Sequence, residues 1–308
     1  MTLKNYNMKR LWIILLLIST GVLAQDKSVK LKYLGCAGWE ISNEKVTILI
    51  DPYISRVKLG EGPSINSDDK RKSFESTGYY ESDTAVIDKT IGKADFILVH
   101  HSHFDHLADV PYIAKKTGAV VIATETSCQI LRAYGIPEKQ LITVKGGEDY
   151  QFENFSVRIL NTLHSPLDHK FYFDSRTYTS PPKAPLKIEE FVEGSSLMFL
   201  VRLSGHELLT MGSMNFIERE VQGLHPDVAL VGANLSRLEI YKYTERLMTA
   251  TNFPKTVIPT HWDNYRVPYG FSQDGSKEKL KLFGDEVKAA SPQSKVLIPV
   301  HLETITIK

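Results

Sequence analysis

Residues 99–106 read Val-His-His-Ser-His-Phe-Asp-His, and they directly follow the apolar residues 96–98. The apolar residues predict a buried strand, so the histidines stand where that strand ends. In an extended chain alternate side chains face the same way, and His101 and His103 can therefore reach one metal ion together. His100 faces away from them, and we expect it to be buried or to support the ligands from behind.

The second half of this stretch supplies two more donors. Asp105 and His106 stand where the chain turns into a helix expected from about residue 108 to 116, so they can turn toward a second ion. Imidazole together with carboxylate suits zinc and other borderline divalent ions. A surface cluster or a set of core histidines is the alternative, but four donors within six residues after a buried strand favour a metal site.

Strand and helix patterns extend over the rest of the chain. Short strands that would form an antiparallel opening sheet are expected at 29–34, 39–42 and 46–50. Strands and helices then alternate, with helices outside packed sheets, and we treat residues 25–308 as one domain. Two irregular segments, near 53–93 and 165–194, are too long for plain connections, and we expect them to be inserted loops that act as lids.

Residues 1–24 have the layout of a secretory signal peptide. Three cations precede the apolar run 11–18, and small residues follow it up to Ala24. The apolar run is shorter than the roughly 20 residues that span a bilayer, so we expect cleavage after Ala24 and no stable membrane anchor. The mature chain would then be periplasmic or secreted.

Composition narrows the class of partner. The chain has 37 Lys and Arg against 36 Asp and Glu, so it carries no basic field that would hold a nucleic-acid backbone. A small-molecule substrate is the better expectation. The two cysteines, Cys36 and Cys128, are too few for a disulfide scaffold, and they could be linked or free.

Taken together, these motifs resemble the metallo-β-lactamase fold hydrolases. The chain is most similar to the branch that includes the ascorbate-6-phosphate lactonase and the phospholipase that cleaves N-acyl phosphatidylethanolamines. Besides the H-x-H-x-D-H motif, the resemblance rests on Leu34-Gly35-Cys36-Ala37-Gly38, Ile48-Leu49-Ile50-Asp51-Pro52, His164 after a strand, the Gly212-Ser213 turn and Pro259-Thr260-His261. It implies a four-layer αββα sandwich with metals at one edge between two sheets.

The resemblance also implies a ligand set. The ligands of the first metal would be His101, His103 and His164. The ligands of the second metal would be Asp105, His106 and His261. His169 competes with His164, and we favour His164 because it ends the strand 157–163, where the family places this ligand. The expected cofactor is Zn²⁺, one or two ions, with Mn²⁺ or Fe²⁺ as alternatives.

Three positions near the motifs bear on the site. Ser213 stands where most members have an Asp that bridges the metals, and loss of that carboxylate should weaken the second metal. A β-lactamase subclass lacks the same Asp and still holds two zinc ions. Cys36 stands where relatives usually have His, and we expect a packed small residue there rather than a thiol at the metal. Asp51 would orient a ligand histidine.

The implied activity is metal-dependent hydrolysis. Zinc lowers the pKa of bound water to about 7 and polarises the scissile carbonyl or phosphoryl oxygen, and Asp105 would act as the catalytic acceptor of the water's proton. The expected substrate is an ester, lactone, amide or phosphodiester. The Tyr and Phe content of the two irregular segments fits a substrate with an apolar part. Tyr265 and Arg266 are candidate substrate contacts or ordinary surface residues.

Two other functions remain open at this point. A periplasmic β-lactamase fits the compartment and the ligand set, although the long inserts fit the lactonase-like branch better. A non-catalytic metal-binding protein of the same fold is suggested by Ser213. A nuclease is disfavoured, because removal of residues 1–24 leaves a slightly acidic chain.

Overall fold

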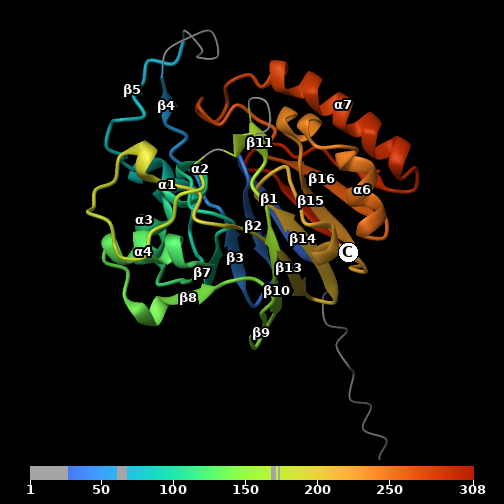
Figure 1. Ribbon diagram of the computed structural model, residues 1–308, viewed down its shortest axis with the longest axis horizontal. Coiled ribbons are helices and arrows are strands. Elements are labelled where there is room, and N and C mark those ends of the chain that lie inside the picture. The colour runs from blue at the N-terminus through green and yellow to red at the C-terminus, as the bar shows by residue number, and fades with distance from the viewer. Residues whose placement is uncertain (1–26, 61–67, 168–170, 173) are drawn as a thin grey trace, which may run out of the picture.

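The computed structural model describes residues 27–60, 68–167, 171–172 and 174–308. The expected signal peptide and His169 lie outside the described residues. Two seven-stranded sheets pack face to face at the centre, and helices cover their outer faces (Figure 1). No helix in the described ranges is both long enough and apolar enough to cross a membrane.

The first sheet has the strand order β18-β1-β2-β3-β6-β7-β8. Its strands are β1 (Val29–Gly35), β2 (Gly38–Ser42), β3 (Thr47–Ile50), β6 (Phe96–Leu98), β7 (Val120–Thr124), β8 (Leu141–Val144) and β18 (Thr304–Ile307). The opening strands β1, β2 and β3 pair antiparallel, as predicted. From β3 through β6 and β7 to β8 the pairing is parallel.

The second sheet repeats this arrangement with the order β17-β16-β15-β14-β13-β10-β9. Its strands are β9 (Asp149–Gln151), β10 (Ser156–Thr162), β13 (Ser196–Leu203), β14 (His206–Met211), β15 (Val228–Gly232), β16 (Thr256–Thr260) and β17 (Lys295–Val296). Strands β9 to β14 pair antiparallel, and β14 to β17 pair parallel. The parallel strands require crossover connections, which the helices provide.

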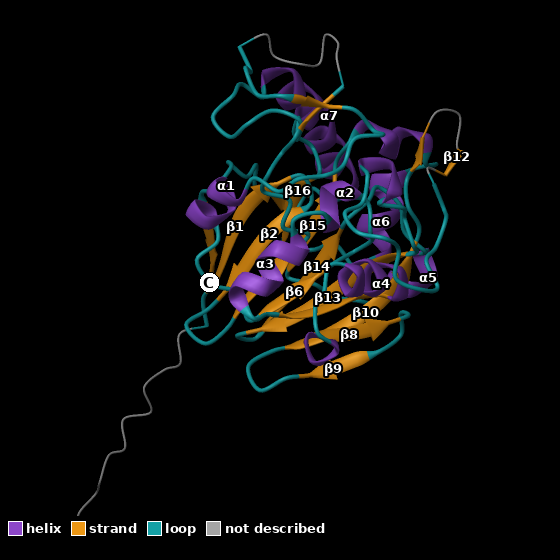
Figure 2. Ribbon diagram, turned by 90° about the vertical axis from the view of Figure 1, so that its left-hand side faces the viewer, coloured by secondary structure: helices purple, strands orange, loops and turns teal. Residues whose placement is uncertain are grey.

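Helices pack on the outer face of each sheet. The first sheet is covered by α1 (Thr84–Thr90), α3 (Val110–Thr117) and α4 (Glu125–Ala133), which stand in front of it in Figure 2. The second sheet is covered by α5 (Glu218–Val221), α6 (Tyr243–Ala250) and α7 (Asp274–Ala290). The short helix α2 (Phe104–Leu107) follows β6 and carries part of the site.

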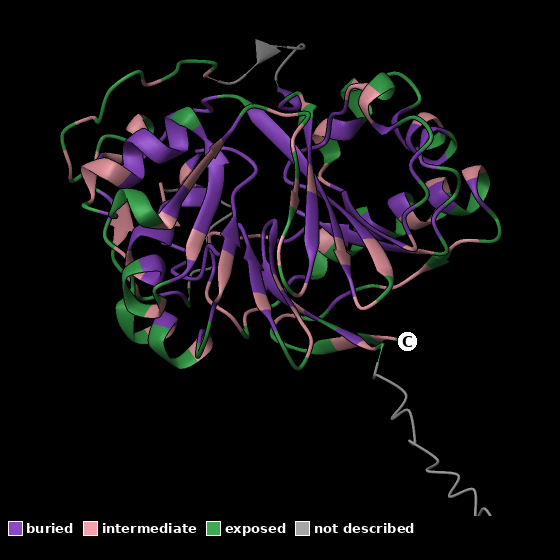
Figure 3. Cartoon of the chain, turned by 90° about the horizontal axis from the view of Figure 1, so that it is seen from below, coloured by how far each residue is buried: buried purple, intermediate pink, exposed green. Residues whose placement is uncertain are grey.

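Both faces of the first sheet are buried. Along β3, Ile48 and Ile50 belong to the core that contains the second sheet, whereas Leu49 belongs to the core beneath α1, α3 and α4. This alternation follows from the two-residue period of a strand. Buried residues accordingly concentrate in the sheets and exposed residues on the outer helices and loops (Figure 3). The predicted four-layer αββα sandwich is confirmed.

The two irregular segments hold more structure than the sequence suggested. The first contains the short parallel pair β4 (Lys58–Leu59) and β5 (Ser73–Phe74) and ends in α1. The prediction of an irregular chain up to residue 93 is therefore wrong at α1, where the Asp83 side chain caps the helix and Ile87 packs against the first sheet. The second segment contains the hairpin β11 (Pro166–Leu167) and β12 (Phe171–Tyr172).

Candidate metal centre

Three histidines meet where β6 and β10 end. His101 and His103 follow β6, and His164 follows β10. Nε2 of His101 lies 3.1 Å from Nδ1 of His103. The ring centroid of His164 lies 4.9 Å from that of His101 and 4.8 Å from that of His103. The structure thus brings together the three residues that we expected at the first metal, and we name them the tri-histidine cluster.

A second group of donors lies beside the first. Asp105 and His106 lie on α2, and His261 directly follows β16. Oδ2 of Asp105 lies 3.4 Å from Nε2 of His261 and 3.8 Å from Nε2 of His106. Cys36, in the turn between β1 and β2, joins these three, and one ligand atom from each of the four lies within 4.8 Å of the others. We name these four residues the mixed cluster.

The donor atoms are spaced as one zinc ion requires. Zinc bonds to nitrogen and oxygen are 2.0–2.2 Å long in tetrahedral sites, so donors to one ion lie about 3.4 Å apart. The separations of 3.1 Å in the tri-histidine cluster and of 3.4 and 3.8 Å in the mixed cluster fit this geometry. Nδ1 of His164 donates to the carbonyl oxygen of Ser165 at 2.9 Å, which leaves the lone pair on Nε2. The residues therefore fit a divalent ion of the zinc type.

Asp51 supports the mixed cluster from behind. It is fully buried at the end of β3, and its Oδ2 lies 2.6 Å from Nδ1 of both His100 and His106. This contact directs Nε2 of His106 toward the other donors. Nε2 of His100 contacts the Thr210 hydroxyl at 2.9 Å. Asp51 thus contacts a candidate ligand in the way expected from the sequence, and His100 is buried behind the donors, also as expected.

The two clusters differ in charge. Burial lowers the pKa of His103 to about 3 and that of His164 to about 4, and burial also lowers the pKa of His101 well below its usual value. These imidazoles are neutral at pH 7, which is the form that binds metal. Burial alone would raise the pKa of Asp105, but His106 and His261 lower it well below its usual range. Asp105 is therefore an anion.

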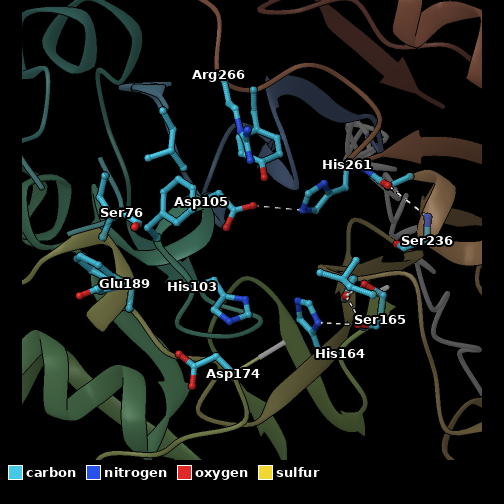
Figure 4. Close-up of a pocket in the computed structure, with 18 of the residues that line it drawn as sticks. Ser76, His103, Asp105, His164, Ser165, Asp174, Glu189, Ser236, His261 and Arg266 are labelled. Carbon is cyan, nitrogen blue, oxygen red and sulfur yellow. Dashed lines mark hydrogen bonds and ion pairs between the residues drawn. The ribbon is translucent and has the colours of Figure 1, made fainter. Parts of the chain in front are cut away.

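Both clusters open onto one cavity of about 600 Å³. His103 and His164 point into it from one side and Asp105 and His261 from the other (Figure 4). Both irregular segments contribute to its wall, the first with Leu59 and Ser76 and the second with Leu167, Asp174, Arg176, Ile188, Glu189 and Phe191. The two segments that we expected to act as lids therefore line the cavity.

Comparison with known proteins places this arrangement in a family. A family model described as a β-lactamase superfamily domain matches residues 30–261. The chain belongs to the β-lactamase superfamily. The match includes every donor of both clusters.

Relatives within the β-lactamase superfamily carry a common description. A UPF0173 metal-dependent hydrolase of Thermodesulfovibrio yellowstonii is 27% identical over 290 residues, covering 88% of this chain and 92% of that protein. A UPF0173 metal-dependent hydrolase of Rhizobium meliloti is 31% identical over 137 residues, covering 44% of this chain and 48% of that protein. The chain therefore spans about half the length of the first curated relatives it matches.

Solved structures support the fold. A metallo hydrolase from the archaeon Ignicoccus hospitalis superposes with a TM-score of 0.56 at 20% identity, covering 91% of this chain and 99% of that one. Identity at this level shows the shared sandwich and leaves the substrate open.

Ser213 marks a departure from most of the superfamily. Its Oγ accepts a hydrogen bond from the Ser165 backbone N–H at 2.9 Å and donates to the Ser165 hydroxyl at 3.2 Å. Asn215, two residues later, donates to the His164 carbonyl oxygen at 3.1 Å. The turn after β14 thus supports the tri-histidine cluster, and its Ser213 hydroxyl contacts Ser165.

Sequence reasoning missed a buried ionic group beneath the mixed cluster. Asp263 accepts hydrogen bonds from the Cys36 backbone N–H at 2.8 Å and from His301 at 2.8 Å, and it pairs with the buried Arg56 at 2.8 Å. A Cβ at Gly35 would collide with the Arg56 guanidinium, so the glycine beside Cys36 is needed for this contact. Arg56, Asp263 and His301 lie far apart in the sequence, so no local pattern predicts that they meet. The one feature in the sequence that could have indicated a close contact is Gly35 next to Cys36. Cys36 and Cys128 are both free.

Proposed function

We propose that this chain is an exported metal-dependent hydrolase that uses a zinc-activated water on an ester, lactone, amide or phosphodiester bond. The observation that carries the proposal is the shared cavity, because neutral imidazoles and an ionised carboxylate face the same space from opposite sides. The relatives from Rhizobium meliloti and Thermodesulfovibrio yellowstonii are described as metal-dependent hydrolases, which supports the same reaction class.

Each side chain would have a separate task in this reaction. His101, His103 and His164 would hold one ion, which when bound supplies an acidified water and polarises the scissile carbonyl or phosphoryl oxygen. The contacts of Asp105 with His106 and His261 use Oδ2. Its other oxygen would accept the proton of the attacking water and keep that water oriented.

The cavity wall supports a substrate with both an apolar and a polar part. Its apolar residues are Leu59, Phe104, Leu167, Ile188, Phe191 and Met214. Tyr265 and Arg266 line the cavity beside His261, and the Arg266 guanidinium carbon lies 6.0 Å from the centre of the Tyr265 ring. Arg266 would bind an anionic or strongly polar group of the substrate, such as a phosphoryl or carboxyl oxygen. A substrate of the kind taken by the lactonase-like branch has this chemistry.

Metal analysis combined with a substrate panel tests the proposal. Protein purified from its native host should contain one or two ions per chain, lose hydrolysis when a chelator removes them, and regain it when Zn²⁺ is added. The panel holds a generic ester, a lactone, an amide, a phosphodiester and a β-lactam. Turnover of the β-lactam alone would replace the proposal by a β-lactamase, and bound metal without any turnover would favour a non-catalytic binding protein.

Export depends on residues 1–24 alone and needs its own test. Mass spectrometry of the protein from its host should give a mature N-terminus at Gln25, because the small residues before it fit a signal-peptidase site. A protein that keeps its first 24 residues would contradict the export proposal without affecting the hydrolase.

A further inference from the structure

Cys36 lies on the interior side of the mixed cluster. Its side chain is fully buried, with Sγ 3.4 Å from Oδ2 of Asp105 and 3.5 Å from Nε2 of His261. Asp105 and His261 line the cavity, whereas Cys36 and His106 are not among the lining residues. The four donors therefore surround one point, two from the cavity side and two from the protein interior.

The separations match those of a sulfur ligand. With a zinc–sulfur bond of 2.3 Å and zinc–nitrogen or zinc–oxygen bonds of 2.0–2.2 Å, a tetrahedral site puts sulfur about 3.6 Å from its fellow donors. The observed sulfur separations are 3.4 and 3.5 Å. We infer that Cys36 is the fourth protein ligand of the second metal, beside Asp105, His106 and His261. The inference rests on the metal binding that the proposed function requires.

The backbone around Cys36 is built to hold the sulfur in this place. Cys36 has φ of 52° and His261 also has φ of 52°, in the left-handed region that non-glycine residues rarely adopt. Their backbones are joined, because the His261 N–H donates to the Cys36 carbonyl oxygen at 2.6 Å. Tyr33 donates to the same oxygen at 3.0 Å. Simple packing of a small residue does not require two costly conformations that aim both side chains at one point.

A thiolate at Cys36 would supply the negative charge that is missing at Ser213. Ser213 has a hydroxyl that contacts Ser165 in place of the carboxylate that most members carry there, so one negative charge is missing on the cavity side. Cys36 would return that charge from the interior, to the second ion only, and a bound thiol loses its proton outright. Four protein ligands would close the second site, whereas three histidines would leave the first site one open position for water or substrate. The tri-histidine cluster would then be the reactive one.

Cobalt substitution tests this assignment without relying on turnover. In the wild-type protein loaded with two Co²⁺ ions, sulfur ligation should give an intense sulfur-to-cobalt charge-transfer band in the near ultraviolet. Cys36→Ser should lose the band and bind the second ion at least about tenfold more weakly, which corresponds to 1.4 kcal/mol. Cys128→Ser, the matched control at the other buried cysteine, should keep both the band and the affinity.

X-ray absorption of the zinc-loaded wild type provides a measurement that needs no variant. It should show one sulfur atom for every two zinc ions, at about 2.3 Å from the metal. Two bound ions without a sulfur signal would overturn the Cys36 assignment and leave the hydrolase proposal intact, as would a band that persists in Cys36→Ser. A wild-type protein that binds no divalent metal would overturn both.

Discussion

The tri-histidine cluster and the mixed cluster lie side by side but are built differently. The first consists of three buried imidazoles whose pKa values are lowered, so its donors are neutral. The second contains the anion Asp105 and is supported by two further buried carboxylates, Asp51 and Asp263. A buried charge needs partners of opposite charge, whereas a neutral imidazole needs only hydrogen bonds, and this explains the ionic network behind the mixed cluster.

This difference predicts that the two metal sites have different roles. A site held by charged, fully supported donors should retain its ion, whereas a site with neutral donors and an open position should do the chemistry. Substitutions in the two clusters and in the residues behind them test this prediction.

His103→Ala should have the largest effect on activity. It removes one of three neutral donors, so the first ion and nearly all turnover should be lost, well beyond the about 10–100-fold cost of losing a group that only orients a ligand. Zinc content and steady-state turnover measure the effect. His225→Ala, at an exposed histidine, is the control and should match the wild type. Full activity with stoichiometric metal in His103→Ala would contradict the whole assignment.

The choice of His164 over His169 is tested in the same assay. His164→Ala should empty the first site, and His169→Ala should do much less. If His169→Ala alone empties the site, the placement of the third ligand is wrong.

Asp263→Asn should give the largest loss of stability. It leaves Arg56 buried without its anion, and breaking a buried ion pair on one side costs about 3–5 kcal/mol. Urea denaturation of the metal-free protein measures the loss. The matched control is Asp88→Asn, because Asp88 pairs with Lys116 at the surface, where solvent screens the pair and its loss should change stability little. Equal midpoints for the two variants would contradict the stabilising role of the buried pair between Arg56 and Asp263.

Asp51→Asn should weaken metal binding selectively. The amide keeps the volume but loses the charge and one acceptor oxygen, so it cannot accept from the His100 backbone N–H and from both imidazoles, and the second ion should bind about 10–100-fold more weakly. The first ion should be nearly unaffected, since Asp51 does not contact a tri-histidine donor. Calorimetric titration with Zn²⁺ resolves the two steps. A loss of equal size at both sites would argue against separate support of the two clusters.

Ser213→Asp should have the smallest effect. It restores a carboxylate on the cavity side, so the second ion should bind more tightly, but by less than about tenfold because the mixed cluster already holds an anion. Activity need not rise, because added negative charge makes the ions weaker Lewis acids. Calorimetry at fixed pH compares the two proteins. Unchanged affinity would show that residue 213 does not face the metals or that the existing ligands already suffice.

Much of the fold and half of the site could be predicted because the information is local. Strand periodicity located the opening strands, and the H-x-H-x-D-H stretch placed four donors within six residues. The prediction of an irregular segment was wrong at α1. Its seven residues form a helix because Ile87 packs against apolar residues from another part of the chain, which the local pattern does not show. His164 and His261 are single residues after strands, and only the family resemblance singled them out.

The sequence by itself determined the opening strands and the donors that are close together in the chain, because strand period and ligand spacing are properties of short segments. The sandwich followed from the family that these motifs resemble. The tertiary structure alone decided which donors share an ion and what supports them. It brought Cys36 to Asp105 and His261, and Arg56 to Asp263, across more than 200 residues of sequence in two of these three contacts. Such contacts form only when the two sheets pack, since the burial that makes charges seek partners does not exist in an isolated segment.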